Sequence, residues 1–103
     1  MPDYTITTLN ISSNELTQLP NDIDKYTNLK TLNCSNNKLT QCDNLPKELE
    51  NLVCNRNNIT QLDNLPLSLK KLVCYKNSLI YDFEPTLENI KKYNASYVNI
   101  LTS

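Results

Sequence analysis

An eight-residue pattern recurs along the chain and constrains its fold more than any other feature. Copies begin at Leu9, Leu32, Leu52 and Leu72, and the third reads Leu-Val-Cys-Asn-Arg-Asn-Asn-Ile. A looser fifth copy aligns on Tyr93, and the steps between copies are 23, 20, 20 and 21 residues. A fixed period of this length is typical of stacked repeats, in which no unit can bury its apolar side chains alone.

Each unit contains a short alternating segment, an asparagine and a return. The alternation Leu-x-(Ile/Cys) predicts a short strand with one buried face. The asparagine that follows is expected to bond backbone groups at a tight inner bend. Leu-Pro then marks the return in the first three units, because proline has no amide donor to leave unpaired. The predicted asparagine ladder consists of Asn14, Asn37, Asn57 and Asn77.

The fifth unit departs from the others. It keeps the phase from Leu87 to Ala95, but Val98 stands where the asparagine is expected. A terminal repeat that departs from the pattern predicts a cap. Ile100 and Leu101 are apolar, so we expect a weak cap and an end of the solenoid that favours self-association.

The complete unit, Leu-Pro-x-x-Leu-x-x-Leu-x-Cys-x-x-Asn-x-(Leu/Ile)-Thr-Gln, resembles a leucine-rich repeat over residues 6 to 101. The short units, carried by residues 45–49 and 65–69, resemble the 20-residue form of bacterial effector proteins. The high Asn, Lys and Ile content without glycine resembles small repeat proteins of giant amoebal viruses. The resemblance implies partner proteins bound on the concave face of a curved solenoid.

We therefore expect an α/β solenoid, a curved right-handed coil of about five repeats with a parallel β-sheet on its concave face. The convex face should be mostly extended or 3-10, with little regular helix beyond one turn within residues 21–29. We expect a single domain over residues 1–103. Its repeats are assigned approximately to residues 6–28, 29–48, 49–68, 69–86 and 87–103.

Composition argues against most other classes of protein. The chain has no histidine and no glycine, which removes His-dependent catalysis and metal sites as well as glycine-rich phosphate loops. We expect no enzyme activity, cofactor or metal. The net charge of −1 predicts binding to neither nucleic acid nor membrane surfaces. The N-terminus shows no signal-peptide pattern, so we expect a cytoplasmic, intracellular protein.

The four cysteines are interpreted as buried packing residues. Cys34, Cys54 and Cys74 share one column, and Cys42 stands where other units have leucine. Parallel strands lie ~4.8 Å apart, whereas the Cβ atoms of a disulfide lie about 3.8 Å apart. Three collinear thiols also cannot surround a tetrahedral metal ion. Cysteine behaves as a small hydrophobic residue in such positions.

The exposed columns of the sheet are the candidate site. One predicted column contains Ser12, Ser35, Asn55 and Tyr75. Basic, aromatic and apolar side chains gather toward the C-terminal units, which suits a protein-binding hot spot for an acidic segment. The candidate partner-binding residues are Val53, Arg56, Lys71, Val73, Tyr75, Lys76 and Tyr97.

Three other readings of the chain remain open. The exposed face of the sheet could be a solvated surface with incidental side chains. An RNA surface is disfavoured, because nearby acidic residues such as Asp43, Glu48, Glu50 and Asp63 offset the basic ones. The runner-up to a non-enzymatic protein–protein interaction module is a structural protein that self-associates, for example as a homodimer, through its terminal repeats.

Overall fold

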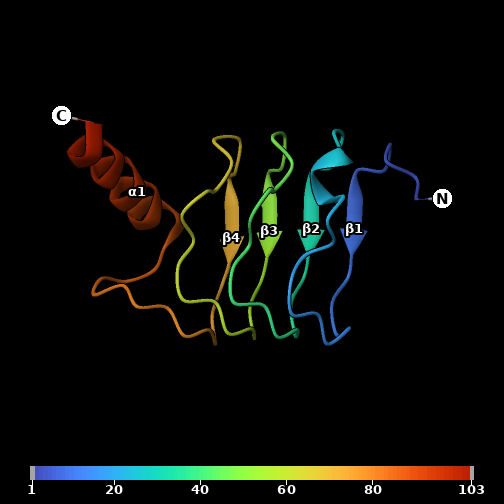
Figure 1. Ribbon diagram of the computed structural model, residues 1–103, viewed down its shortest axis with the longest axis horizontal. Coiled ribbons are helices and arrows are strands. Elements are labelled where there is room, and N and C mark those ends of the chain that lie inside the picture. Colours follow the sequence, from blue (N-terminus) through green and yellow to red (C-terminus); the bar gives the residue numbers. More distant parts are fainter. Residues whose placement is uncertain (1, 103) are drawn as a thin grey trace.

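Four short strands lie side by side in the order in which they occur in the chain. The computed structural model describes the backbone of residues 2–102 and the side chains of residues 2–96. All neighbouring strands are parallel, and the sheet order is β1-β2-β3-β4. Figure 1 shows these strands with helix α1 beyond β4, at the end opposite the N-terminus. The strands are β1 (Thr8–Asn10), β2 (Thr31–Asn33), β3 (Asn51–Val53) and β4 (Lys71–Val73).

The strand register confirms the repeat alignment. Leu9, Leu32, Leu52 and Leu72 are direct neighbours across the sheet. Leu32 and Leu52, in the two middle strands, are fully buried. The leucines of the outer strands are partly exposed, because each has a neighbouring strand on one side only. The parallel sheet and the stacked coils together establish the α/β solenoid.

The core is one continuous column that runs through the coils. Each coil contributes its strand leucine, the isoleucine or cysteine two residues later, and the apolar residue after the asparagine, and the first three coils add leucines from their returns. Leu39 and Ile59, which follow ladder asparagines, are fully buried as predicted. All four cysteines are buried and free, as expected for packing residues.

The asparagine ladder joins each coil to the coil before it. The Asn57 side-chain oxygen accepts a hydrogen bond from the Leu39 amide at 3.0 Å. Its side-chain nitrogen donates to the carbonyls of Cys34 and Cys54, each at 3.1 Å. Asn57 therefore links the second and third coils through their backbones, which no apolar side chain could do.

Two further members of the ladder repeat this arrangement. Asn37 accepts from the Leu16 amide at 2.9 Å, and Asn77 accepts from the Ile59 amide at 3.0 Å. Asn14 differs, because its side chain is exposed. Each of the other ladder side chains reaches back one coil, and no coil among the described residues lies before that of Asn14. The prediction is thus confirmed for three asparagines and wrong for Asn14.

The returns follow the predicted difference in length. The long return of the first coil contains a single 3-10 turn, η1 (Ile23–Lys25), within the expected segment. The shorter returns, at residues 40–50 and 60–70, have no regular helix. Ser68 ties two of them together, because its hydroxyl donates to the carbonyls of Lys47 and Leu49.

The fifth repeat is not a strand-containing coil. Residues 87–102 form helix α1 (Leu87–Thr102) instead. Leu87, Ile90 and Tyr93 are three residues apart, which places them on one face of a helix. The Thr86 hydroxyl accepts from the Asn89 amide at 3.1 Å, as in a helix N-cap. The fifth of the expected repeats is therefore a terminal helix rather than a further coil, and Val98, Ile100 and Leu101 have side chains outside the described residues.

Candidate interaction surface

The exposed face of the sheet places the predicted site residues of β3 and β4 next to one another. Val53 lies beside Val73, and Asn51 lies beside Lys71. Both valines are half-buried, whereas Lys71 is exposed. Alternation along a strand turns these side chains away from the leucine core. A small apolar strip flanked by a lysine thus lies at the C-terminal end of the sheet.

Arg56 and Lys76 occupy equivalent bends just after the strands. Their φ angles are 59° and 57°, in the left-handed region that non-glycine residues rarely adopt. The Arg56 amide donates to the Tyr75 carbonyl at 3.0 Å, which stacks one bend on the next. Both side chains are exposed, so the bends present two cations one coil apart.

The predicted exposed column that includes Tyr75 is only partly exposed. Ser35 and Asn55 are each 6% exposed, whereas Tyr75 is 56% exposed. The Ser35 hydroxyl turns back to the side-chain oxygen of Asn33, 2.7 Å away, because the chain is already bending there. The interpretation of Ser35 and Asn55 as solvent-facing was therefore wrong. Tyr75 differs because no strand of the described residues lies beyond its coil.

The last predicted site residue, Tyr97, belongs to helix α1. Its side chain lies outside the described residues, so its place relative to the sheet stays a prediction. The structure thus brings six of the seven predicted residues to the end of the sheet formed by β3 and β4.

Charge is unevenly distributed along the solenoid. Residues 1–50 contain seven acidic and four basic residues, a net charge of −3. Residues 51–103 contain four acidic and six basic residues, a net charge of +2. Among the described residues, Arg56, Lys71 and Lys76 make no ion pair. Their positive charges are consequently not neutralised within the described chain.

The buried thiols offer little reactivity. A hydrogen bond with Cys42, together with burial, raises the pKa of Cys34 far above its ordinary value. The bond to Cys34 lowers the pKa of Cys42, but a bond with Cys54 and burial outweigh it, so this pKa is also raised. Burial raises the pKa of Cys74. Because the thiolate is the nucleophile and metal ligand, these groups are poorly suited to either role.

The rest of the described surface carries shallow clefts and no cluster of metal ligands. No group of three or more Cys, Asp or Glu side chains there is arranged to hold a metal ion. Two shallow clefts, of about 610 and 740 Å³, lie on the return side beside Leu45-Pro46 and Leu65-Pro66. A third, of about 400 Å³, lies beside β4. Sequence reasoning missed this last groove because it expected a fifth repeat to be stacked there.

A parallel sheet of stacked coils, with a leucine column and an asparagine ladder, defines the class of short repeat solenoids. A family model described as Leucine Rich repeats (2 copies) matches residues 5–47. The same leucine and asparagine positions continue in register through β3 and β4. Residues 5–47 are thus similar to leucine-rich repeats, which supports a leucine-rich repeat protein.

Comparison with curated proteins and with solved structures found no match. Leucine-rich repeats are in general protein-interaction modules, typically without enzyme activity. None of the helices in the described part of the chain is long and apolar enough to cross a membrane.

Proposed function

We propose that this protein binds a partner protein through the exposed sheet face over β3 and β4. The observation that carries the proposal is the gathering of unneutralised cations around an exposed tyrosine and a paired-valine strip. Together with Tyr97, which remains an expected member, the proposed contact residues are Val53, Arg56, Lys71, Val73, Tyr75 and Lys76.

The chemistry of this surface favours an acidic partner segment. Tyrosine and arginine are enriched at binding hot spots because they combine apolar area with directional hydrogen bonds. Arg56, Lys71 and Lys76 add a local positive potential, which steers acidic partners and discriminates against basic ones. Val53 and Val73 supply apolar area that is already half-covered, so its further burial favours binding without exposing a large patch beforehand.

Affinity capture from cell lysate tests the proposal. The bait is the wild-type chain beside the double variant Lys71→Glu, Tyr75→Ala. The matched control is Thr8→Glu, Ser12→Ala, which makes the same changes at the equivalent repeat positions of the first coil. We expect a protein retained by the wild type and the control and lost by the double variant, because only that variant reverses a charge at the proposed face.

Two results would count against the proposal. Equal retention of the partner by all three baits would place its binding elsewhere on the molecule. Recovery of only the chain itself would favour the self-associating protein, and sedimentation would then give a mass that rises with concentration. Thermal unfolding of each bait shows that a lost partner does not reflect a lost fold.

A further inference from the structure

The first three coils each offer the same hydrogen-bonding edge to the coil that follows. The carbonyl just before each strand accepts two amides of the next coil, and two amides after each strand donate to the next coil. The distances for all of these bonds lie between 2.8 and 3.1 Å. The accepting carbonyls are those of Thr7, Lys30 and Glu50, and the donating amides are those of Ile11, Cys34, Cys54, Ser13, Asn36 and Arg56.

The corresponding backbone edge of the fourth coil has no backbone partner among the described residues. By position, its members are the carbonyl of Lys70 and the amides of Cys74 and Lys76. No described residue makes a backbone hydrogen bond with any of these three groups. Lys71 and Val73 turn their backbone groups toward β3, so the groups of Leu72 between them face the same open edge.

A groove lies along this edge because the chain continues as a loop and a helix. Figure 1 shows α1 as the next element beyond β4, inclined to the strands rather than aligned with them. The groove has a volume of about 400 Å³. Residues of β4 and its bend form one wall, and the segment before α1 together with the first residue of the helix forms the other. Its lining includes Leu72, Cys74, Tyr75, Glu84, Pro85 and Leu87.

Charge at this edge indicates the chemistry of an occupant. Glu50 lies between two lysines, 3.7 Å from the Lys30 ammonium and 3.8 Å from that of Lys70. This row of alternating charges across the coils ends at Lys70. A carboxylate on an added strand would continue the alternation. The parallel column ends at Lys71, which makes no ion pair with a described residue. Val73 and Leu72 then favour apolar side chains beside them.

We propose that the open edge of β4 binds an extended segment of a partner protein, which adds a parallel fifth strand beginning with two acidic residues. This proposal rests on the proposed function and specifies how the partner is held. Backbone hydrogen bonds supply affinity in such strand addition, and alternate side chains supply specificity. The carboxylates lie against Lys70 and Lys71, and the apolar residues follow beside Leu72 and Val73.

A second copy of this chain fits the edge less well. If β1 of another copy continued the sheet in register, Thr7 and Thr8 would lie beside Lys70 and Lys71. Those threonines provide no negative charge for either lysine. Charge complementarity therefore favours an acidic segment over the chain's own first strand.

A capped hexapeptide, Glu-Glu-Leu-Val-Ala-Asn, is the probe. It is the 50–55 stretch with Glu in place of Asn51 and Ala in place of Cys54. N-methylation of its valine amide removes the donor that faces Leu72, whereas N-methylation of its alanine amide alters a group on the far side of the new strand. Fluorescence polarisation compares the three peptides on the full chain.

We expect the valine-methylated peptide to bind at least about tenfold more weakly than the parent peptide. The alanine-methylated peptide should bind within about twofold of the parent. On the protein, Lys71→Glu should weaken the parent peptide about tenfold, whereas Lys92→Glu, an exposed site on α1, should leave its binding unchanged.

Three outcomes would overturn strand addition at β4. Equal binding of both methylated peptides would show that side chains alone hold the probe, and the sheet-face function would stand without the edge. No binding of the parent peptide at about 1 mM would reject the edge site, while the capture experiment with the Lys71→Glu, Tyr75→Ala variant still decides the sheet face. Dimerisation of the free chain through β4, seen by sedimentation, would make a second copy the occupant.

Discussion

A ladder asparagine stabilises this protein because its side-chain amide forms hydrogen bonds with backbone groups of the neighbouring coil. Asn57 satisfies one amide and two strand-end carbonyls from two coils and is only 7% exposed. Hydrogen bonds of this kind contribute modestly when made, but a buried group left without a partner costs its full desolvation. The ladder therefore matters most at coils with a neighbour on both sides.

Replacing Asn57 by alanine should lower the free energy of unfolding by about 2–4 kcal/mol, because several backbone groups lose their partner. The matched control is Asn14→Ala at the exposed first position of the ladder, where the change should stay within about 0.5 kcal/mol. Urea unfolding measures both. Equal losses for the two variants would show that the ladder does not act between coils.

Backbone bends mark the limit of sequence-based prediction at the residue scale. Leucine alternation was sufficient to predict the register, because each strand buries one residue in two. The left-handed bends could not be predicted, since glycine usually marks them and this chain has none. In the described part of the chain these bends lie instead at Ser13, Glu15, Asn36, Asn44, Arg56 and Lys76. This missing signal also explains why the buried Ser35 and Asn55 were predicted to be exposed.

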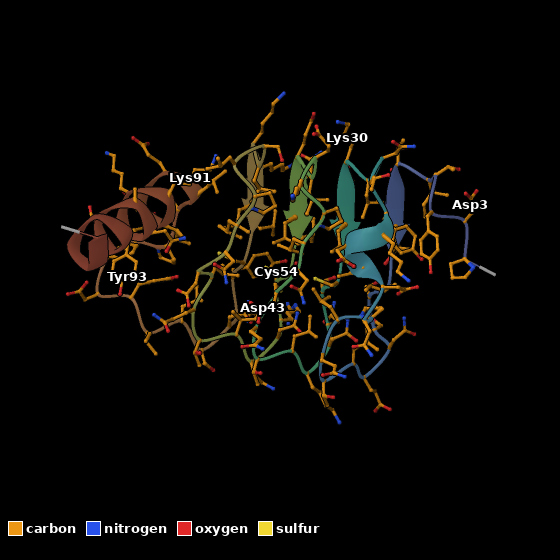
Figure 2. All side chains as sticks on the ribbon, turned by 45° about the horizontal axis from the view of Figure 1, so that its top comes forward. Asp3, Lys30, Asp43, Cys54, Lys91 and Tyr93 are labelled. Carbon is orange, nitrogen blue, oxygen red and sulfur yellow. The ribbon has the colours of Figure 1, made fainter. Side chains whose placement is uncertain are left out.

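Helix α1 is the element that covers the C-terminal end of the core. Ile90 is fully buried, and Tyr93 packs edge-on against Tyr81 with 5.3 Å between ring centroids. The Lys91 ammonium donates to the Leu69 carbonyl at 2.7 Å, and the Asn94 amide donates to the Leu62 carbonyl at 2.9 Å. Figure 2 shows Lys91 and Tyr93 on different sides of the helix. The helix thus closes the end by packing and by bonding return carbonyls.

Ile90→Ala should destabilise the chain by about 2–5 kcal/mol, since it leaves a cavity where the helix meets the core. Lys92→Ala, an exposed neighbour on the same helix, is the control and should change stability by less than about 0.5 kcal/mol. Thermal unfolding followed by circular dichroism compares them. If Ile90→Ala unfolds at the wild-type midpoint, α1 contributes nothing to closing the core.

The fifth unit was misread because its apolar spacing fits two kinds of element. Leu87, Ile90 and Tyr93 fit the leucine spacing of a repeat and the face of a helix equally well. The absent asparagine and the threonine before Leu87 were the distinguishing signals. Without a ladder residue, a fifth strand would have left the backbone at its inner bend unsatisfied, and the helix satisfies its own backbone instead.

At the scale of the whole molecule, the buried thiols link stability to alkaline pH. Cys34, Cys42 and Cys74 have raised pKa values in the folded chain. Unfolded thiols ionise near their ordinary value of about 8.5. Above that pH the folded state holds more protons than the unfolded state, so the free energy of unfolding decreases as pH rises. The stabilising contribution is complete below about pH 8 and is lost on going higher.

Between pH 7.5 and 9.5 we expect a loss of roughly 1 kcal/mol for each thiol that stays protonated in the folded chain. Urea unfolding in the presence of a reducing agent measures it. Cys74→Ala removes one such thiol and should make the decrease with pH shallower. A free energy of unfolding that stays constant over this range would contradict the protected state of the thiols.

Some features of the proposed site could be predicted from the repeat pattern, whereas others depend on how the repeats and α1 pack together. The pairing of Val53 with Val73 could be predicted from the repeat alignment, because the strand register determines which side chains are neighbours. Tyr75 is exposed for a reason outside its own unit, namely the absence of a strand beyond it. The β4 groove depends on where α1 begins and on its inclination to the strands, which no single repeat encodes.

The reach of each asparagine into the coil before it has an evolutionary consequence. Every junction uses the same interlocking contacts, so a 20-residue block such as residues 49–68 can be duplicated or deleted as a whole without remaking the others. Each added block would lengthen the molecule by roughly one strand spacing, ~4.8 Å. Duplication or loss of such blocks in the gene would then change the length of the solenoid in equal increments. Helix α1 would remain unchanged after the last coil.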